Sequence, residues 1–201
     1  MDKKSYALGM NMGINMRQSG IKGLNYEDFT AGLKALLEGG EPAMEIDEAA
    51  EILNKYFNEI EEEQKAEQAE IGKAFKAEGE KFLAGNARNE GVKVLASGLQ
   101  YKVITEGKGR HPKATDRVRC HYEGRFTDGQ IFDSSYKRGE PAVFGLNQVI
   151  RGWTEGLQLM AEGSKYELYI PYQLGYGEMG SNGAIPPCCA LVFTVELLEV
   201  L

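Results

Sequence analysis

The chain has 201 residues, of which 42% are hydrophobic and 26% are charged, a composition that fits one or two globular domains and excludes a disordered protein. Its net charge of −7 argues against nucleic acid and anionic membrane surfaces as partners, because both attract basic faces. No apolar run has the length of a signal peptide or a membrane span, so we expect a cytoplasmic protein; the alternative is a periplasmic protein whose signal segment has been removed.

Residues 1–45 predict a pair of helices. The stretch LGMNMGINM fits a strand, because it alternates apolar with small or polar residues, but it also fits a helix that Ser5 caps and Gly20 ends. The next segment is clearer, since Asn25 is a good N-cap and Gly39 a good stop for a helix with one apolar face. A helix there favours a helix in the first segment too, so that the two form a hairpin.

The hairpin has too little apolar material for a sturdy core, since even an N-terminal piece of about 60 residues is small for an independent domain. Its apolar faces and several methionines, whose flexible side chains suit a seam between helices, favour packing of residues 1–45 against a second copy of the chain. The alternative is that these methionines fill an intramolecular core.

Residues 46–90 predict one long connecting helix, because no proline interrupts them. At about 1.5 Å per residue such a helix spans about 60 Å. Its middle, EEEQKAEQAE at 61–70, has no apolar stripe and is typical of a helix that bridges domains through solvent. Three glycines in its second half would each cost about 1 kcal/mol relative to alanine: Gly72, Gly79 and Gly85.

Residues 91–201 predict an α+β domain, an antiparallel sheet with one short helix. Period-two alternation indicates strands in GLQYKVITEG, VRCHYEGRF, SKYELYIP and ALVFTVELLEVL. Asp128-Gly129 predicts a hairpin turn that leads into QIFDSS. Between the strands, QVIRGWTEGLQLM has the apolar spacing of a helix.

Several enzyme classes are excluded by missing motifs. The sequence has no G-x-S-x-G, no H-E-x-x-H and no phosphate-binding loop. His121 falls on the opposite strand face from Cys120, which argues against a Cys–His nucleophile, and a hydrolase that used Asp133 would lack a partnered base. Cys188 and Cys189 are adjacent and no C-x-x-C occurs, so we expect reduced thiols. The sequence predicts neither a metal nor a cofactor.

An aromatic set in the second domain forms a candidate site. In a sheet curled around one helix, alternating strand residues and the helix face point inward, which would gather Tyr122, Phe132, Trp153, Tyr176 and Phe193. An ordinary core position is the alternative for each of them. Tyr176 differs, because it lies in a loop between two glycines and would present its ring and hydroxyl to a neighbour. Asp133 ends a strand, where its carboxylate could orient groups at a pocket edge.

Several separated motifs carry a resemblance to a known family. HYEGRFTDGQIFDSS, EPAVFGLNQVIRGWTEGLQLM, GYG and IPP followed by ALVFTVELLEVL resemble the FKBP-type peptidyl-prolyl cis-trans isomerases over about residues 97–201. The helical N-terminal half resembles the bacterial Mip-like subgroup, in which two short helices form an intertwined dimer and a long helix carries each catalytic domain. The resemblance implies a half-barrel sheet wrapped around a short helix, isomerase activity without a cofactor, and chaperone activity as a homodimer.

The resemblance also implies roles for the matched positions. Trp153 would be the floor under the substrate proline. The walls would be Tyr122, Phe132, Val149, Ile150 and Phe193. The backbone N–H of Ile150 and the hydroxyl of Tyr176 would bind substrate carbonyls, and Asp133 would lie near the carbonyl that swings during rotation. Ile185 would belong to a flap over the site.

The chain departs from the single-domain members of that family at Ala142, Ser181 and Ala184, which replace bulkier wall and flap residues. The cavity should therefore be shallower at its outer edge, which affects the affinity for macrolides of the rapamycin or tacrolimus type and the preference for the residue before proline. The expected partners are proline-containing segments of unfolded or folding proteins and a second copy of the chain. A non-catalytic peptide-binding chaperone is the competing interpretation.

Overall fold

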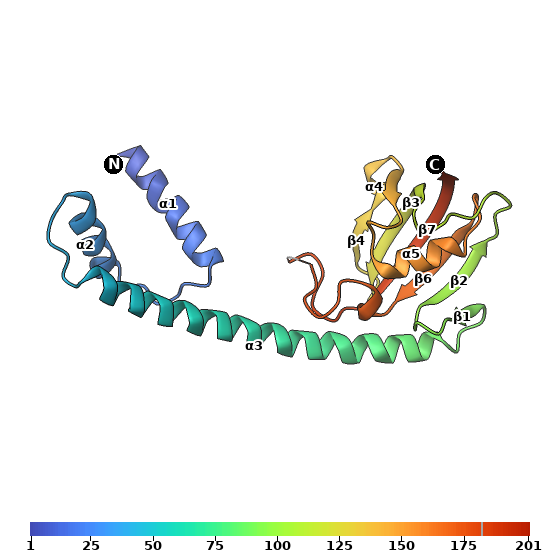
Figure 1. The fold of residues 1–201 in the computed structure, drawn as a ribbon, viewed down its shortest axis with the longest axis horizontal. Coiled ribbons are helices and arrows are strands. Elements are labelled where there is room, and N and C mark those ends of the chain that lie inside the picture. Colours follow the sequence, from blue (N-terminus) through green and yellow to red (C-terminus); the bar gives the residue numbers. More distant parts are fainter. Residues whose placement is uncertain (182) are drawn as a thin grey trace. The chain divides into compact units, whose positions relative to one another are not determined.

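The computed structural model describes residues 1–181 and 183–201 (Figure 1). The chain forms two compact units, Met1–Glu67 and Gln68–Leu201, and the division between them falls inside one long helix. Among the described residues, no helix is both long and apolar enough to cross a membrane.

The first unit holds α1 (Lys3–Gln18), α2 (Tyr26–Leu37) and the first part of α3 (Ile46–Asn86). The helical interpretation of the first segment is confirmed, but its N-cap is Asp2 and not Ser5. The Asp2 carboxylate accepts hydrogen bonds from the backbone N–H groups of Lys4 and Ser5 at 3.3 and 3.1 Å, which satisfies donors that a helix start leaves free. Asn25 caps α2 as predicted.

The link between α1 and α2 is fixed to α3. The Tyr56 hydroxyl accepts from the backbone N–H of Lys22 at 3.2 Å and donates to the carbonyl of the same residue at 3.0 Å. Gly20 has φ +82° and lies against Gln64, whose Nε2 would be 2.5 Å from an added Cβ. No residue of α1 or α2 is buried, so this unit leaves the apolar faces of both helices uncovered.

The second half of α3 packs against the sheet domain through small residues. Its buried positions, Gly72, Gly79 and Asn86, are seven apart and therefore share one face. A Cβ on Gly79 would lie 2.9 Å from the Cβ of Ala190. Two of the three glycines that were expected only to weaken the helix, Gly72 and Gly79, are thus points of close approach, whereas Gly85 faces open space.

The second unit contains seven strands: β1 (Val92–Val94), β2 (Gln100–Thr105), β3 (Arg117–Phe126), β4 (Ile131–Ser134), β5 (Ala142–Gly145), β6 (Lys165–Ile170) and β7 (Leu191–Val200). They form one antiparallel sheet with the order β1-β2-β6-β7-β3-β4 (Figure 1), and β5 pairs with β3 as well. Short helices follow three of them: α4 (Ser135–Arg138), α5 (Arg151–Gln158) and the 3-10 helix η1 (Tyr172–Leu174). The predicted α+β class is confirmed, and Asp128-Gly129 makes the turn between β3 and β4.

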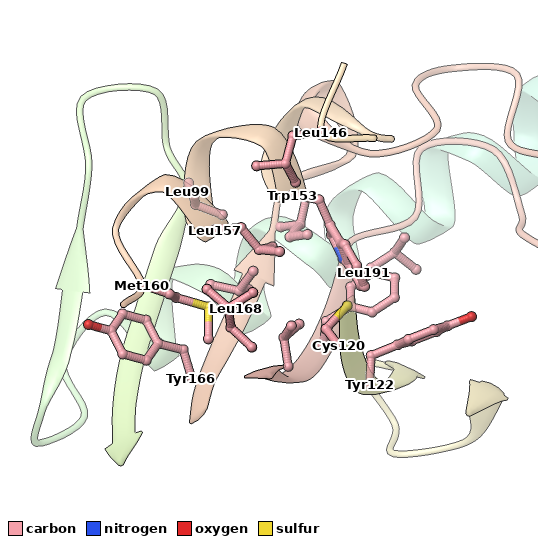
Figure 2. Close-up of a cluster of buried hydrophobic side chains, with 14 of the residues drawn as sticks. Leu99, Cys120, Tyr122, Leu146, Trp153, Leu157, Met160, Tyr166, Leu168 and Leu191 are labelled. Carbon is pink, nitrogen blue, oxygen red and sulfur yellow. The ribbon is translucent and has the colours of Figure 1, made fainter. Parts of the chain in front are cut away.

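Two glycines bring α5 close to the sheet. A Cβ on Gly152 would lie 2.6 Å from Cγ2 of Ile170, and a Cβ on Gly156 would lie 2.8 Å from Cδ1 of Leu168. This close approach puts Trp153 and Leu157 among the buried side chains of the domain, as Figure 2 shows. The core therefore determines where the aromatic face of α5 lies.

Candidate active site

A cavity of about 290 Å³ opens beside α5 in the second unit. Its lining comes from five strands and helices and the loops between them: Tyr122, Phe132, Asp133, Phe144, Gln148, Val149, Ile150, Trp153, Tyr176 and Phe193. Every site residue predicted from the sequence lies in this lining except Ile185. That residue is 5% exposed, belongs to the core, and pairs with Ser181 in an isolated antiparallel bridge.

Trp153 is both a core residue and part of the cavity lining. It is 4% exposed, and three rings meet it at 83° to 86°, with centroids at 5.2 Å for Tyr122 and 5.4 Å for Phe144 and Phe193. Edge-to-face pairs of this kind hold an aromatic side chain in one orientation. The indole Nε1 is buried and has no hydrogen-bond partner among the described residues.

One wall depends on a glycine in the middle of β3. The rings of Phe132 and Phe193 meet at 86° with centroids 5.5 Å apart. A Cβ on Gly124 would lie 2.6 Å from Cζ of Phe132 and 2.7 Å from Cε1 of Phe193. Only glycine leaves room for both rings, so Gly124 determines the shape of this wall.

A polar network crosses the rim of the cavity. The Asp133 carboxylate accepts from the Tyr122 hydroxyl and from Nη1 of Arg138, and Nη2 of Arg138 donates to the Tyr122 hydroxyl at 2.8 Å. Partial burial acts to raise the pKa of Asp133, but the hydrogen bonds from Tyr122 and Arg138 outweigh it, so this pKa lies below its usual value. Burial, together with the bond to Asp133, raises the pKa of Tyr122. The carboxylate is therefore charged and the phenol neutral.

Two donors at the cavity make no hydrogen bond within the part of the chain that the structure describes: the backbone N–H of Ile150 and the hydroxyl of Tyr176. Ile150 is the N-cap of α5, with extended backbone angles, so its N–H precedes the helical ladder. Burial and the charge of Asp133 raise the pKa of Tyr176, which keeps its hydroxyl protonated. Both groups can donate to carbonyl oxygens of a bound molecule.

Sequence reasoning missed Phe144, Gln148 and Arg138. Phe144 lies on the same side of β5 as Ala142, and the alternation of AVFG was the available signal. Phe144 thus supplies an aromatic wall near the position where Ala142 lacks one. Arg138 reaches Asp133 across the short helix α4, and no residue spacing indicates such a pair.

The cysteines do not join the cavity lining. Cys120 and Cys189 are buried, and burial raises the pKa of their thiols to about 12 and about 11. Cys188 is half-buried and has φ 55°. His121 contacts Ser135 through Nδ1 at 3.0 Å, outside the buried cluster that holds Cys120. Over residues 1–181 and 183–201, no three His, Cys, Asp or Glu side chains are grouped as metal ligands.

Comparison with known families gives two matches that together span most of the chain. Residues 108–198 match the family described as FKBP-type peptidyl-prolyl cis-trans isomerase. Residues 1–103 match the domain amino-terminal to FKBP-type peptidyl-prolyl isomerase.

Individual proteins are similar over nearly the full length. The FKBP-type 22 kDa peptidyl-prolyl cis-trans isomerase of Escherichia coli is 48% identical, over 98% of this chain and 94% of that protein. The outer membrane protein MIP of Legionella longbeachae is 37% identical, over 99% of this chain and 85% of that protein. The crystal structure of FkpA from Escherichia coli has a TM-score of 0.71 and 37% identity, and it covers 98% of this chain and 95% of its own.

Proposed function

Since the chain belongs to the family of FKBP-type peptidyl-prolyl cis-trans isomerases, we propose that it accelerates rotation about X–Pro peptide bonds in the cavity lined by Trp153. The observation that carries this assignment is the enclosure of Trp153 by three edge-on aromatic rings at the base of an open, mainly apolar cavity. The substrates are proline-containing segments of unfolded or folding proteins.

The apolar cavity favours the transition state for a physical reason. A planar amide is polar because its nitrogen lone pair is conjugated with the carbonyl, and rotation through a barrier of about 20 kcal/mol breaks that conjugation. The twisted amide is less polar than the planar amide. Its transfer from water into a cavity of aromatic rings therefore costs less free energy of desolvation. Each 1.4 kcal/mol or so of this difference is worth about tenfold in rate.

Hydrogen bonds to the flanking backbone would fix the ends of the substrate while its middle turns. We assign this role to the Ile150 N–H and the Tyr176 hydroxyl, which are free donors among the described residues and lie in the lining of the same cavity. Phe132, Val149 and Phe193 supply apolar walls of the cavity.

Asp133 acts in this scheme as a charged anchor rather than as a base. Both of its oxygens already accept hydrogen bonds, from Tyr122 and from Arg138, and its pKa is depressed. It orients the ring of Tyr122 and presents a fixed negative charge at the rim. The depressed pKa argues against a hydrolase, because it makes the Asp133 carboxylate a poor acceptor for a proton from water.

The sole tryptophan allows a direct test of the site. A macrolide of the rapamycin type is titrated into the protein, and both the fluorescence of Trp153 and the isomerisation of a short X–Pro peptide are followed. We expect activity to fall in proportion to the fluorescence change, because one ligand fills the cavity. If the protein kept full activity when the fluorescence change is saturated, the reaction would take place outside this cavity. If the protein without macrolide had no activity, the competing interpretation as a non-catalytic peptide-binding chaperone would be favoured.

We further propose that two chains associate through α1 and α2 and hold clients between their domains as a chaperone. No residue of either helix is buried, and large apolar side chains such as Leu8, Met10 and Ile14 are 64%, 56% and 45% exposed. An intramolecular core made by these methionines is not supported. The predicted parts, residues 1–45 for dimerisation, 46–90 for connection and 91–201 for catalysis, remain part of this proposal.

The test uses the compact unit 68–201, which keeps the half of α3 that packs on the sheet. The full chain should have a solution mass of twice 22.2 kDa, and the fragment should be monomeric. The fragment should isomerise the short peptide at the rate of the full chain and lose most of its effect on the refolding of a protein client. Undiminished refolding assistance by the fragment would refute the holding role.

The predicted cytoplasmic location stays a prediction, and the names of the relatives do not support it. One relative is called an outer membrane protein, which favours the periplasmic alternative. Fractionation of cells that express the natural gene decides between the two: recovery with periplasmic marker proteins would refute the cytoplasmic prediction.

A further inference from the structure

A second concave surface lies beside the loop that carries Tyr176. This groove holds about 420 Å³, and it runs between the second half of α3 and the loop from η1 to β7. Its lining includes Gln68, Ile71, Met179, Ile185, Pro186 and Pro187, all of which belong to the second compact unit.

The two walls of the groove are in contact at Gly72. A Cβ on Gly72 would lie 3.3 Å from the Cβ of Pro187, so this glycine lets α3 and the loop meet. The loop itself is closed by a bridge in which the Ser181 N–H donates to the Ile185 carbonyl at 2.9 Å and the Ile185 N–H to the Ser181 carbonyl at 3.1 Å. These contacts within the chain hold the two walls of the groove together.

The groove exposes apolar side chains from both walls. Ile71 on α3 is 40% exposed, and Met179 on the loop is 79% exposed. Among the described residues, its lining includes no charged side chain. Burial of such surface is favourable by about 25 cal/mol per Å², and a methionine adapts its shape to varied apolar partners. This chemistry suits the apolar side chains of a polypeptide rather than a charged ligand.

The groove and the cavity lie close together along one short loop. Tyr176 lines the cavity and Met179 lines the groove, and three residues of chain cannot separate their Cα atoms by more than about 11 Å. An extended polypeptide advances about 3.3 Å per residue, so three or four residues beyond the cavity suffice to reach the groove.

We propose that the groove binds apolar residues of an unfolded client, a few positions along the chain from the X–Pro bond that lies in the cavity. The inference rests on the proposed function and extends it, because it makes the enzyme prefer long unfolded substrates to short peptides. A tetrapeptide fills the cavity alone, whereas a protein client occupies both surfaces and gains affinity from the second.

The test is the full-length double variant Ile71→Glu/Met179→Glu, which places charge on both walls. Two substrates are compared: a short X–Pro peptide, and an unfolded protein whose refolding is limited by prolyl isomerisation. We expect kcat/KM for the protein to fall about tenfold, mainly through KM, because glutamate on either wall must be desolvated when a client binds. The value for the peptide should not change. Val94→Glu/Ile104→Glu on β1 and β2 is the matched control, because it adds the same two charges at side chains that are 53% and 51% exposed and lie outside the groove.

Each other outcome is decisive. Unchanged activity on the protein client overturns the proposal, and so does an equal loss in Val94→Glu/Ile104→Glu, which would make the effect one of net charge. A parallel loss on the short peptide would mean that the groove is no separate subsite. A change in solution mass of the double variant would mean that a second copy covers the groove. Absence of peptide isomerisation by the unmodified chain would instead refute the proposed function.

Discussion

Replacement of Trp153 separates the packing role of this side chain from its role in the cavity. Trp153→Ala removes a ring that is 4% exposed and its contacts with three other rings. Truncation of a buried tryptophan typically lowers the free energy of unfolding by about 3–5 kcal/mol, of which each edge-to-face pair accounts for about 0.5–1.5 kcal/mol. With the floor gone, kcat/KM for an X–Pro peptide should fall at least about 100-fold.

Trp153→Phe is the informative companion. It keeps one ring against the same neighbours and removes the buried Nε1, which has no partner among the described residues. An unpaired buried donor costs about 1–3 kcal/mol, so its removal offsets much of the lost packing. We expect the free energy of unfolding to change by less than about 1.5 kcal/mol, and kcat/KM to stay within about tenfold of the unmodified value.

The assays are urea denaturation followed by far-ultraviolet circular dichroism and isomerisation of a short X–Pro peptide by the folded variants. Full activity in folded Trp153→Ala would refute the assignment of the cavity. Equal destabilisation by alanine and phenylalanine would refute the reasoning about Nε1.

The remaining predictions concern the donors, the charged network and the α3 contact. Tyr176→Phe removes one hydrogen bond to substrate, so kcat/KM should fall about 3- to 30-fold with no loss of stability; an unchanged value would exclude this hydroxyl. Since the pKa of Asp133 is lowered and those of Tyr122 and Tyr176 are raised, all three keep one protonation state from about pH 5 to 9, and kcat/KM should be flat there. A bell-shaped dependence of kcat/KM on pH would instead indicate general acid–base catalysis. The depressed pKa of Asp133 contributes stability that is present above its usual pKa and is lost as the pH falls through the lowered value. Acid should therefore weaken the rim network only below about pH 4. The free energy of unfolding, measured by urea denaturation, should be at least about 1 kcal/mol lower for Gly79→Ala than for Gly85→Ala. Both variants gain helix propensity, but a Cβ at position 79 would lie 2.9 Å from the Cβ of Ala190, whereas Gly85 has open space. Equal stabilities would mean that α3 does not pack as described.

Local patterns in the sequence predicted helix caps, turns and strands correctly where a residue type has a single common structural role. Asn25 caps α2, Asp128-Gly129 turns the chain between β3 and β4, and the alternation of VRCHYEGRF matches the buried face of β3. The short strands β1 and β5 were missed, because three or four residues hold too little periodicity to detect. Ser5 was a plausible cap by residue type, but Asp2 is the residue whose side chain reaches the free N–H groups.

The amino-acid sequence by itself determined the fold class, the family and most of the cavity lining, because these depend on apolar periodicity and on motifs that are contiguous in the chain. Only the tertiary structure decided which residues lie together across the chain. It joined Arg138 to Asp133, brought Phe144 against Trp153, and left Ile185 outside the cavity lining as a buried residue of the loop before β7. It also gave Gly72 and Gly79 a packing role where helix propensity predicts only a cost, since the space beside a glycine is a property of the neighbouring segment and not of the helix that contains it.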